Sequence, residues 1–205
     1  MKKSCVTALV MVLLACISVM PFSTILLTTV MAYGNLMETY GQAVPQDDGY
    51  LYVSGIGLTD NAWDEVLLYI YDAEIYDLRT GFAINPNDIY DGNYVRVVYE
   101  PEMSNNDYPL ARAIVIYVHA GEPDTADFIV AVSDNIWYSN ESCIFVTMDG
   151  KYRFTVTEDT LLLDGYGREI SFEEIAPGME MFVWAAFVTA SFPGQVIPDK
   201  IVLLD

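Results

Sequence analysis

The feature of this sequence that most limits its fold is a series of landmarks that occurs twice in the same order. Residues 88–97 and 174–183 both read as an acidic residue, Ile, two spacers, Gly and then an apolar strand pattern. Strand-like runs precede each stretch, and an aromatic-proline step follows it, Tyr108-Pro109 or Phe192-Pro193, ahead of a final apolar strand. Such self-similarity indicates two copies of one structural unit. The predicted organisation is an N-terminal segment over 1–32, a linker over 33–48, a first β module over 49–120, a linker over 121–126 and a second β module over 127–205.

Each copy consists of short β-branched and aromatic runs separated by Gly, Asn, Asp and Pro, which is typical of strands joined by turns. Asp149-Gly150 predicts a type I′ hairpin turn, and Ser171 with Glu174 fits a capping box that predicts a short helical turn. The expected fold is all-β: two tandem small OB-like five-stranded barrels, each with one short helical turn, after an N-terminal signal helix. Because about 75 residues is a small core, we expect the two copies to pack together.

The N-terminal segment has the composition of an export signal. Two lysines precede an apolar stretch, 6–31, that contains no charged residue, as a signal peptide requires. Three outcomes are open: cleavage between Ala32 and Tyr33, lipidation of Cys16 in a lipobox-like Leu-Leu-Ala-Cys sequence, or retention as a membrane anchor. Each outcome predicts a bacterial protein that is secreted or attached to the outer side of the cytoplasmic membrane.

The chain is strongly acidic, with 29 Asp and Glu against 9 Lys and Arg and a formal net charge of -20. Nucleic acid is therefore not expected as a partner, because basic side chains hold phosphate backbones. Anionic wall polymers are disfavoured for the same reason. Cys143 is the only cysteine beyond the N-terminal segment and stands in an apolar run. We expect it to be a buried strand thiol.

The second copy contains a pattern that resembles a known family. Within 167–184 stand the pieces Gly-Arg-Glu-Ile-Ser-Phe-Glu-Glu-Ile, Pro-Gly-Met-Glu and Val-Trp, and 189–195 reads Thr-Ala-Ser-Phe-Pro-Gly-Gln. These pieces resemble a segment of the YobA-like small lipoproteins and related secreted clostridial β modules of Firmicute envelope proteins. The resemblance covers residues 127–205, and the first copy keeps only its Tyr108-Pro109 step. It implies an exported β module, without an established activity.

Two groups of residues are candidates for ligand binding. One consists of Ser191, Phe192, Pro193 and Gln195, in which polar groups beside an aromatic ring are suited to a binding rim. The alternative for this group is a rigid entry to the last strand, with Pro193 fixing the backbone and Phe192 capping the core.

The tyrosines form the other group. Ten of the 15 tyrosines lie between positions 50 and 117. Tyr69 and Tyr71 share one face of a predicted strand, and Val66, Leu68 and Ile70 share the opposite face. The two tyrosines predict an aromatic platform for a glycan or peptide. The alternative is packing between modules or between copies of the chain.

Metal binding and catalysis have little support in the sequence. Asp88 and Asp91 are weak calcium candidates, because Ile89 occupies a position where an oxygen ligand is needed and no Glu closes the loop. A turn cap explains Asp88 better. No catalytic motif is present, His119 is expected to be an exposed linker residue, and two small barrels offer no obvious cleft.

These observations predict a non-enzymatic envelope module without a cofactor. Its expected partner is a cell-wall component or an extracellular protein, and it would meet the membrane only through the N-terminal segment. Two other functions are considered: a structural protein that pairs through β edges, and a small hydrolase that uses carboxylates.

Overall fold

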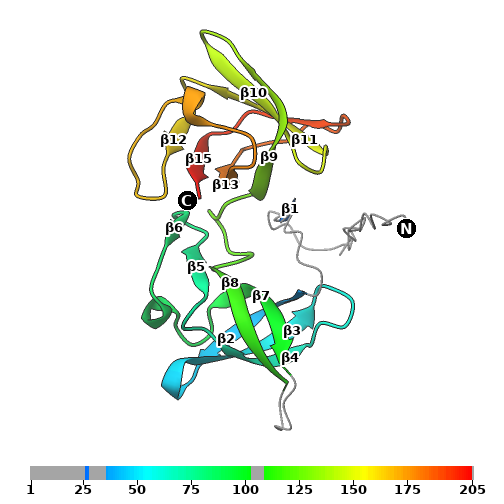
Figure 1. Cartoon of the computed structure of the whole chain (residues 1–205), viewed down its shortest axis with the longest axis vertical. Coiled ribbons are helices and arrows are strands. Elements are labelled where there is room, and N and C mark those ends of the chain that lie inside the picture. Colours follow the sequence, from blue (N-terminus) through cyan, green and yellow to red (C-terminus); the bar gives the residue numbers. More distant parts are fainter. Residues whose placement is uncertain (1–25, 28–35, 103–108, 205) are drawn as a thin grey trace, which may run out of the picture.

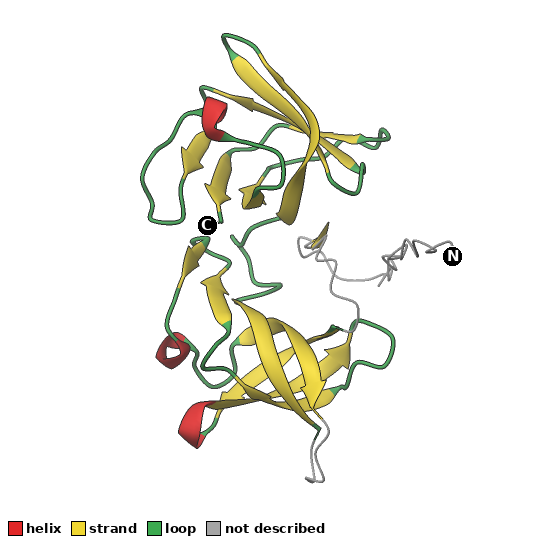
Figure 2. Cartoon of the chain, in the orientation of Figure 1, coloured by secondary structure: helices red, strands yellow, loops and turns green. Residues whose placement is uncertain are grey.

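The computed structural model describes residues 26–27, 36–102 and 109–204. In this part of the chain the regular elements are strands and three 3-10 helices of three residues each (Figure 2), and no helix is long and apolar enough to span a bilayer. The expected all-β class is confirmed. Cys16, Ala32 and Tyr33 lie outside the described residues, so the fate of the N-terminus stays a prediction. The described pair Leu26–Leu27 forms β1, which runs parallel to β9 (Phe128–Tyr138).

The first module contains a closed five-stranded barrel. Its elements are β2 (Met37–Pro45), η1 (Asp47–Gly49), β3 (Tyr50–Gly57), β4 (Glu65–Tyr69), β5 (Glu74–Asp77), β6 (Phe82–Ala83), η2 (Pro86–Asp88), β7 (Tyr94–Glu102) and β8 (Leu110–Val118). The strands follow the order β4-β3-β2-β7-β8-β5-β6, and a parallel ladder between β4 and β8 closes the first five of these into a ring. A barrel in this half of the chain was expected.

Strand β2 occupies the stretch 33–48 that we expected to be a linker. Its inward residues are Thr39, Gly41 and Ala43, which are buried although none is a large apolar side chain. The hydrophobic alternation by which sequence predicts a strand is therefore weak here. Because β2 joins β3 to β7 in the barrel, the first module begins well before residue 49.

The second module is built on one sheet. It contains β9, β10 (Ser142–Thr147), β11 (Tyr152–Thr157), β12 (Leu161–Leu163), η3 (Phe172–Glu174), β13 (Glu180–Trp184), β14 (Gly194–Val196) and β15 (Lys200–Leu203), in the order β12-β15-β13-β9-β10-β11-β14. Residues 197–199 separate β14 from β15, and Pro198 has no N–H for a ladder. In the described residues, the ladders close a ring in the first module only.

Both modules carry a capped 3-10 turn ahead of the strand that follows it. In η3 the Ser171 N–H donates to the Glu174 carboxylate over 3.1 Å, and Ser171 Oγ accepts from the Glu173 N–H. In η2 the Asn85 N–H donates to the Asp88 carboxylate over 3.0 Å. The predicted capping box is confirmed, and Asp88 has the equivalent role to Glu174.

The predicted hairpin around Asp149-Gly150 joins β10 to β11, but its turn type differs from the prediction. A type I′ turn needs two central residues with positive φ. Here only Gly150 has one, at 72°. The Gly150 N–H donates to the Thr147 carbonyl, and the Asp149 carboxylate accepts from Thr147 Oγ1 and the Lys151 N–H. The side chain of Asp149 therefore stabilises this turn.

The modules pack together through an apolar cluster of their own. It joins buried residues of the first module and of the connecting segment to Ile129 and Phe182 of the second. The Phe182 ring meets Tyr76 and Tyr117 edge-on, with centroids 5.5 and 6.0 Å away. In Figure 1, β5 and β6 extend from the barrel toward the second module. The expected packing of the two modules against each other is confirmed.

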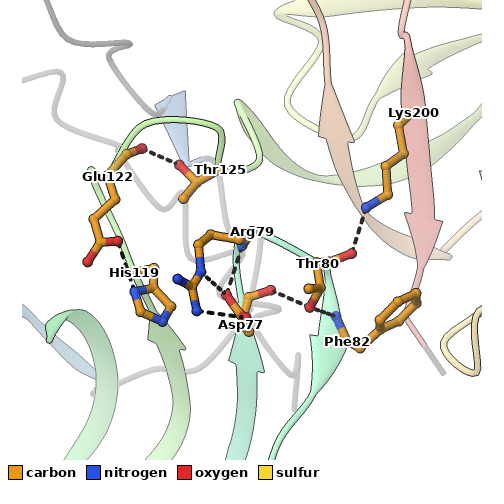
Figure 3. Close-up of polar contacts among 8 residues, drawn as sticks. All are labelled: Asp77, Arg79, Thr80, Phe82, His119, Glu122, Thr125 and Lys200. Atoms are coloured by element: carbon orange, nitrogen blue, oxygen red, sulfur yellow. Dashed lines mark hydrogen bonds and ion pairs between the residues drawn. The ribbon is translucent and has the colours of Figure 1, made fainter. Parts of the chain in front are cut away.

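Polar contacts add to this interface (Figure 3). The Lys200 ammonium lies 3.9 Å from the centre of the Trp184 ring and donates to the Thr80 carbonyl over 2.7 Å. His119, which we expected to be exposed, is only 8% exposed, and its Nδ1 lies 2.9 Å from the Glu122 carboxylate. The linker histidine is buried because the connecting segment packs between the modules instead of crossing open solvent.

Candidate ligand-binding surfaces

The tyrosines of β4 and the turn after it lie on the outside of the first barrel. Val66, Leu68 and Ile70 are buried in its core, as the strand period predicts. Tyr69 is half-buried, and Tyr71 is 63% exposed. Neither belongs to the cluster between the modules, where other tyrosines pack. Packing between modules therefore does not account for Tyr69 and Tyr71.

Tyr50 of β3 extends this aromatic group. It stands directly across from Tyr69 in the antiparallel ladder, and their rings meet edge-on with centroids 5.7 Å apart. The rings of Tyr69 and Tyr71 are 5.6 Å apart. We call Tyr50, Tyr69 and Tyr71 the tyrosine surface. Tyr50 was not predicted as a site residue, because cross-strand register joins residues far apart in the chain.

The backbone at Gly49 lies close against the tyrosine surface. Gly49 has a φ of +79°, and a Cβ at this position would come within 1.9 Å of Tyr71 Cε2. Glycine thus serves two purposes here, a left-handed backbone and room for the ring. The position of the Tyr71 ring depends on this residue.

The Ser191 motif forms the loop that leads into β14, and its polar groups are largely used within that loop. Ser191 Oγ and Gln195 Nε2 both donate to the Pro193 carbonyl, over 2.9 and 3.0 Å. Ser191 Oγ also lies 2.7 Å from Thr189 Oγ1, which accepts from the Gln195 N–H. Ser191 and Gln195 therefore stabilise the loop conformation, as the architectural alternative predicts.

Phe192 does not cap the core. Its side chain is 85% exposed, and Phe187, in the same connection between β13 and β14, is 63% exposed. The peptide bond between Phe192 and Pro193 is cis. Gly194 is buried beside Tyr152 and Val188, where a Cβ would lie 3.1 Å from each side chain. The motif therefore holds an aromatic ring in solvent, while Gly194 allows close packing at the start of β14.

The outer face of the second module carries an aromatic residue that we did not predict as a site residue. Trp137 of β9 is 53% exposed, and the Arg153 guanidinium lies 5.9 Å from the centre of its ring. Arg153 is level with Gln195 in the parallel ladder between β11 and β14. This face therefore differs from the tyrosine surface in carrying a cation.

The other residues considered from the sequence, Asp88, Asp91 and Cys143, are accounted for by their places in the fold. Asp88 caps η2, and Asp91 is exposed in the next turn. No cluster of three potential metal-binding His, Cys, Asp or Glu side chains occurs within the described ranges. Cys143 is fully buried in β10, as expected, and burial raises the pKa of its thiol to about 11, with a further contribution from the charge of Glu173.

A groove between the modules contradicts our expectation that two small barrels offer no cleft. Its volume is about 900 Å³, within the range of small-molecule sites. Glu74 and Tyr76 of β5 and Tyr117 of β8 line it from the first module, and Glu174 and Glu180 line it from the second. No single segment of the sequence contains this combination, so only the packing of the two modules reveals it.

Glu180 is half-buried in this groove. Burial raises the pKa of its carboxyl group above the ordinary value, and the negative charge of Glu74 raises it further. A carboxyl group whose pKa is higher in the folded state binds its proton more tightly there. Ionised Glu180 therefore lowers the stability of the fold at neutral pH, and this loss disappears as the pH falls below the unfolded-state pKa, about 4.3.

The substitution Glu180→Gln is therefore expected to raise the melting temperature at pH 7 by about 1–2 °C and to have no effect near pH 4. Circular dichroism melts across this pH range measure the difference. Glu65→Gln, on an exposed part of β4, removes the same charge outside the groove. A lower melting temperature for Glu180→Gln at pH 7, or an equal gain for Glu65→Gln, would contradict this account.

Comparison of the chain with protein-family models, with curated proteins and with solved structures found no match.

Proposed function

We propose that the chain is an exported, non-enzymatic envelope module that binds a neutral glycan or a peptide through the tyrosine surface. The observation that carries this proposal is the contact of three tyrosine rings on the outside of β3 and β4 and the turn after β4. Tyrosine combines a rigid apolar face with a polar hydroxyl group and loses little conformational freedom on binding. Such a surface suits sugar rings and peptide side chains.

The strand order of the first barrel supports this position for a site. Three ring strands, β2, β3 and β4, precede η2, and two, β7 and β8, follow it, with β4 and β8 parallel. We infer an OB-like barrel from this order. OB-folds bind ligands on the face of their second and third strands, which are β3 and β4 here.

The ladders of the second module support a duplicated OB-like unit. β9, β10 and β11 pair as β2, β3 and β4 do, and β13 pairs with β9 as β7 pairs with β2. The parallel ladders β11–β14 and β12–β15 match those that β4 and β5 form with β8. We infer that β14 and β15 are the two halves of a divided fifth strand.

The proposed location is the outer side of the bacterial cytoplasmic membrane. The apolar N-terminal segment and the resemblance of residues 127–205 to YobA-like envelope lipoproteins support it. The net charge of -20 favours a neutral glycan, a peptide or a basic protein over an anionic wall polymer. We expect the purified protein to sediment with isolated cell-wall sacculi. Protein that stays in the supernatant in both calcium and chelator would exclude wall binding.

Tyr71→Ala is expected to weaken binding to sacculi about fivefold or more, because it removes an exposed ring from the tyrosine surface. Tyr90→Ala is the matched control, since Tyr90 is similarly exposed, at 65%, but makes no contact with these rings. Sedimentation at several sacculus concentrations gives both affinities. Equal binding of the two variants would exclude the tyrosine surface as the site.

Gly49→Ala provides a second measurement that leaves every tyrosine in place. The added methyl group would displace the Tyr71 ring, whereas Gly92→Ala introduces alanine at a similar φ, +83°, with no atom within 4 Å of the new Cβ. Both substitutions are expected to lower stability by about 1–2 kcal/mol. Only Gly49→Ala should weaken binding, and equal affinities would show that the position of Tyr71 is unimportant.

A further inference from the structure

The groove between the modules has an aromatic wall. Tyr76 and Tyr117 line it, and their rings are stacked with centroids 6.3 Å apart. Tyr117 is only 2% exposed, so the partly exposed Tyr76 is the ring that a ligand can reach. Phe182 packs edge-on against both rings and is fully buried. The electron-rich faces of tyrosine rings attract cations such as ammonium and guanidinium groups. This wall is fixed in place by the packing of the two modules.

Carboxylates from both modules accompany the aromatic wall. Glu74 lies on β5, where its side chain accepts a hydrogen bond from the Tyr76 hydroxyl over 3.2 Å, and Glu180 begins β13. Arg168 also lines the groove, where it pairs with Asp164. In the part of the chain that the structure describes, the ion pairs include neither Glu74 nor Glu180. A cation between these two carboxylates would offset both their mutual repulsion and the cost of burying the Glu180 charge.

We propose that this groove binds the basic side chains of a peptide, with the ammonium or guanidinium group held between Glu74 and Glu180 and its alkyl chain against Tyr76. An inorganic cation fits less well, because a metal ion prefers several oxygen ligands and no three potential ligand side chains lie together within the described residues. A long basic side chain uses both features, since its stem packs on apolar surface while its charged end meets carboxylates. This site is separate from the tyrosine surface and does not depend on it.

The probe is a capped tetralysine peptide titrated into the full-length protein by isothermal calorimetry at low salt. The double variant Glu74→Gln/Glu180→Gln is expected to bind it about tenfold more weakly. The matched control, Glu65→Gln/Glu141→Gln, removes the same charge from exposed positions outside the groove and should bind nearly as well as the parent. The same peptide with acetylated lysines should not bind.

Three outcomes would overturn the proposal. The first is absence of tetralysine binding to the parent protein. The second is equal weakening in both double variants, which would indicate diffuse attraction to an acidic protein. The third is equal binding of the acetylated peptide. Melting curves of each variant verify folding, and neutralising Glu180 is expected to leave the fold at least as stable as the parent at pH 7.

Discussion

Phe182→Ala is expected to lower the free energy of unfolding by about 3–5 kcal/mol, the range for deletion of a fully buried aromatic ring. Phe182 has no exposed surface and lies on β13, yet the rings that it contacts belong to the first module. Its loss leaves a cavity in the apolar cluster between the modules. We therefore expect hydrogen exchange of β5 and the adjoining half of β8 to accelerate in this variant.

Phe145→Ala is the matched control for this experiment. Phe145 is also fully buried, and it stacks on Phe154 within the core of the second module, with centroids 5.0 Å apart. Its loss should cost a similar free energy of unfolding while leaving the contacts of Phe182 in place. Chemical denaturation measures the first quantity, and hydrogen exchange measures the second. Equal exchange rates in β5 for both variants would show that Phe182 does not couple the modules.

Much of the local structure could be predicted from the sequence because it depends on neighbouring residues. The strand period places Val66 and Leu68 in the core and Tyr69 outside, and burial on β4 follows it. The capping box at Ser171 is recognisable for the same reason, since all of its partners lie within four positions. The alternation of a strand and the capping of a helical turn depend only on nearby residues, so both can be recognised without knowledge of the fold.

The elements that the sequence did not predict depend on distant residues. In β2, Thr39 occupies an inward position because its hydroxyl group donates to the Trp63 carbonyl and meets the Tyr99 hydroxyl. Those partners make a polar residue acceptable in the core, and nothing near Thr39 in the chain indicates them. His119 is buried for a similar reason, since packing of the modules covers the connecting segment.

The candidate sites also combine residues that could be predicted locally with residues that only the fold brings together. Tyr69 and Tyr71 could be identified from one strand, but Tyr50 joins them only through the ladder between β3 and β4. The groove requires Glu74 and Glu180 from separate modules, so its existence depends on how the modules pack. For Phe192 the sequence left two alternatives, a core cap or part of a binding rim, and its 85% exposure excludes the core cap.

Gly55→Ala is expected to destabilise the protein by about 3 kcal/mol, at the upper end of the range for overpacking. Gly55 of β3 lies directly opposite Gly41 of β2. A Cβ at position 55 would come within 2.1 Å of the Tyr40 carbonyl oxygen and 2.4 Å of Gly41 Cα. Both are backbone atoms, so the collision cannot be relieved by rotation of a side chain.

The closed ring makes this collision more costly than it would be in an open sheet. Strand β2 is held on its other side by β7, and β3 is held by β4, so neither strand can move outward without disturbing another ladder. Gly194→Ala is the control, because its Cβ would lie 3.1 Å from the side chains of Tyr152 and Val188, which can shift. It should cost less than about 1.5 kcal/mol. Urea denaturation measures both variants, and equal losses of stability would mean that β2 and β3 can separate without strain elsewhere in the barrel.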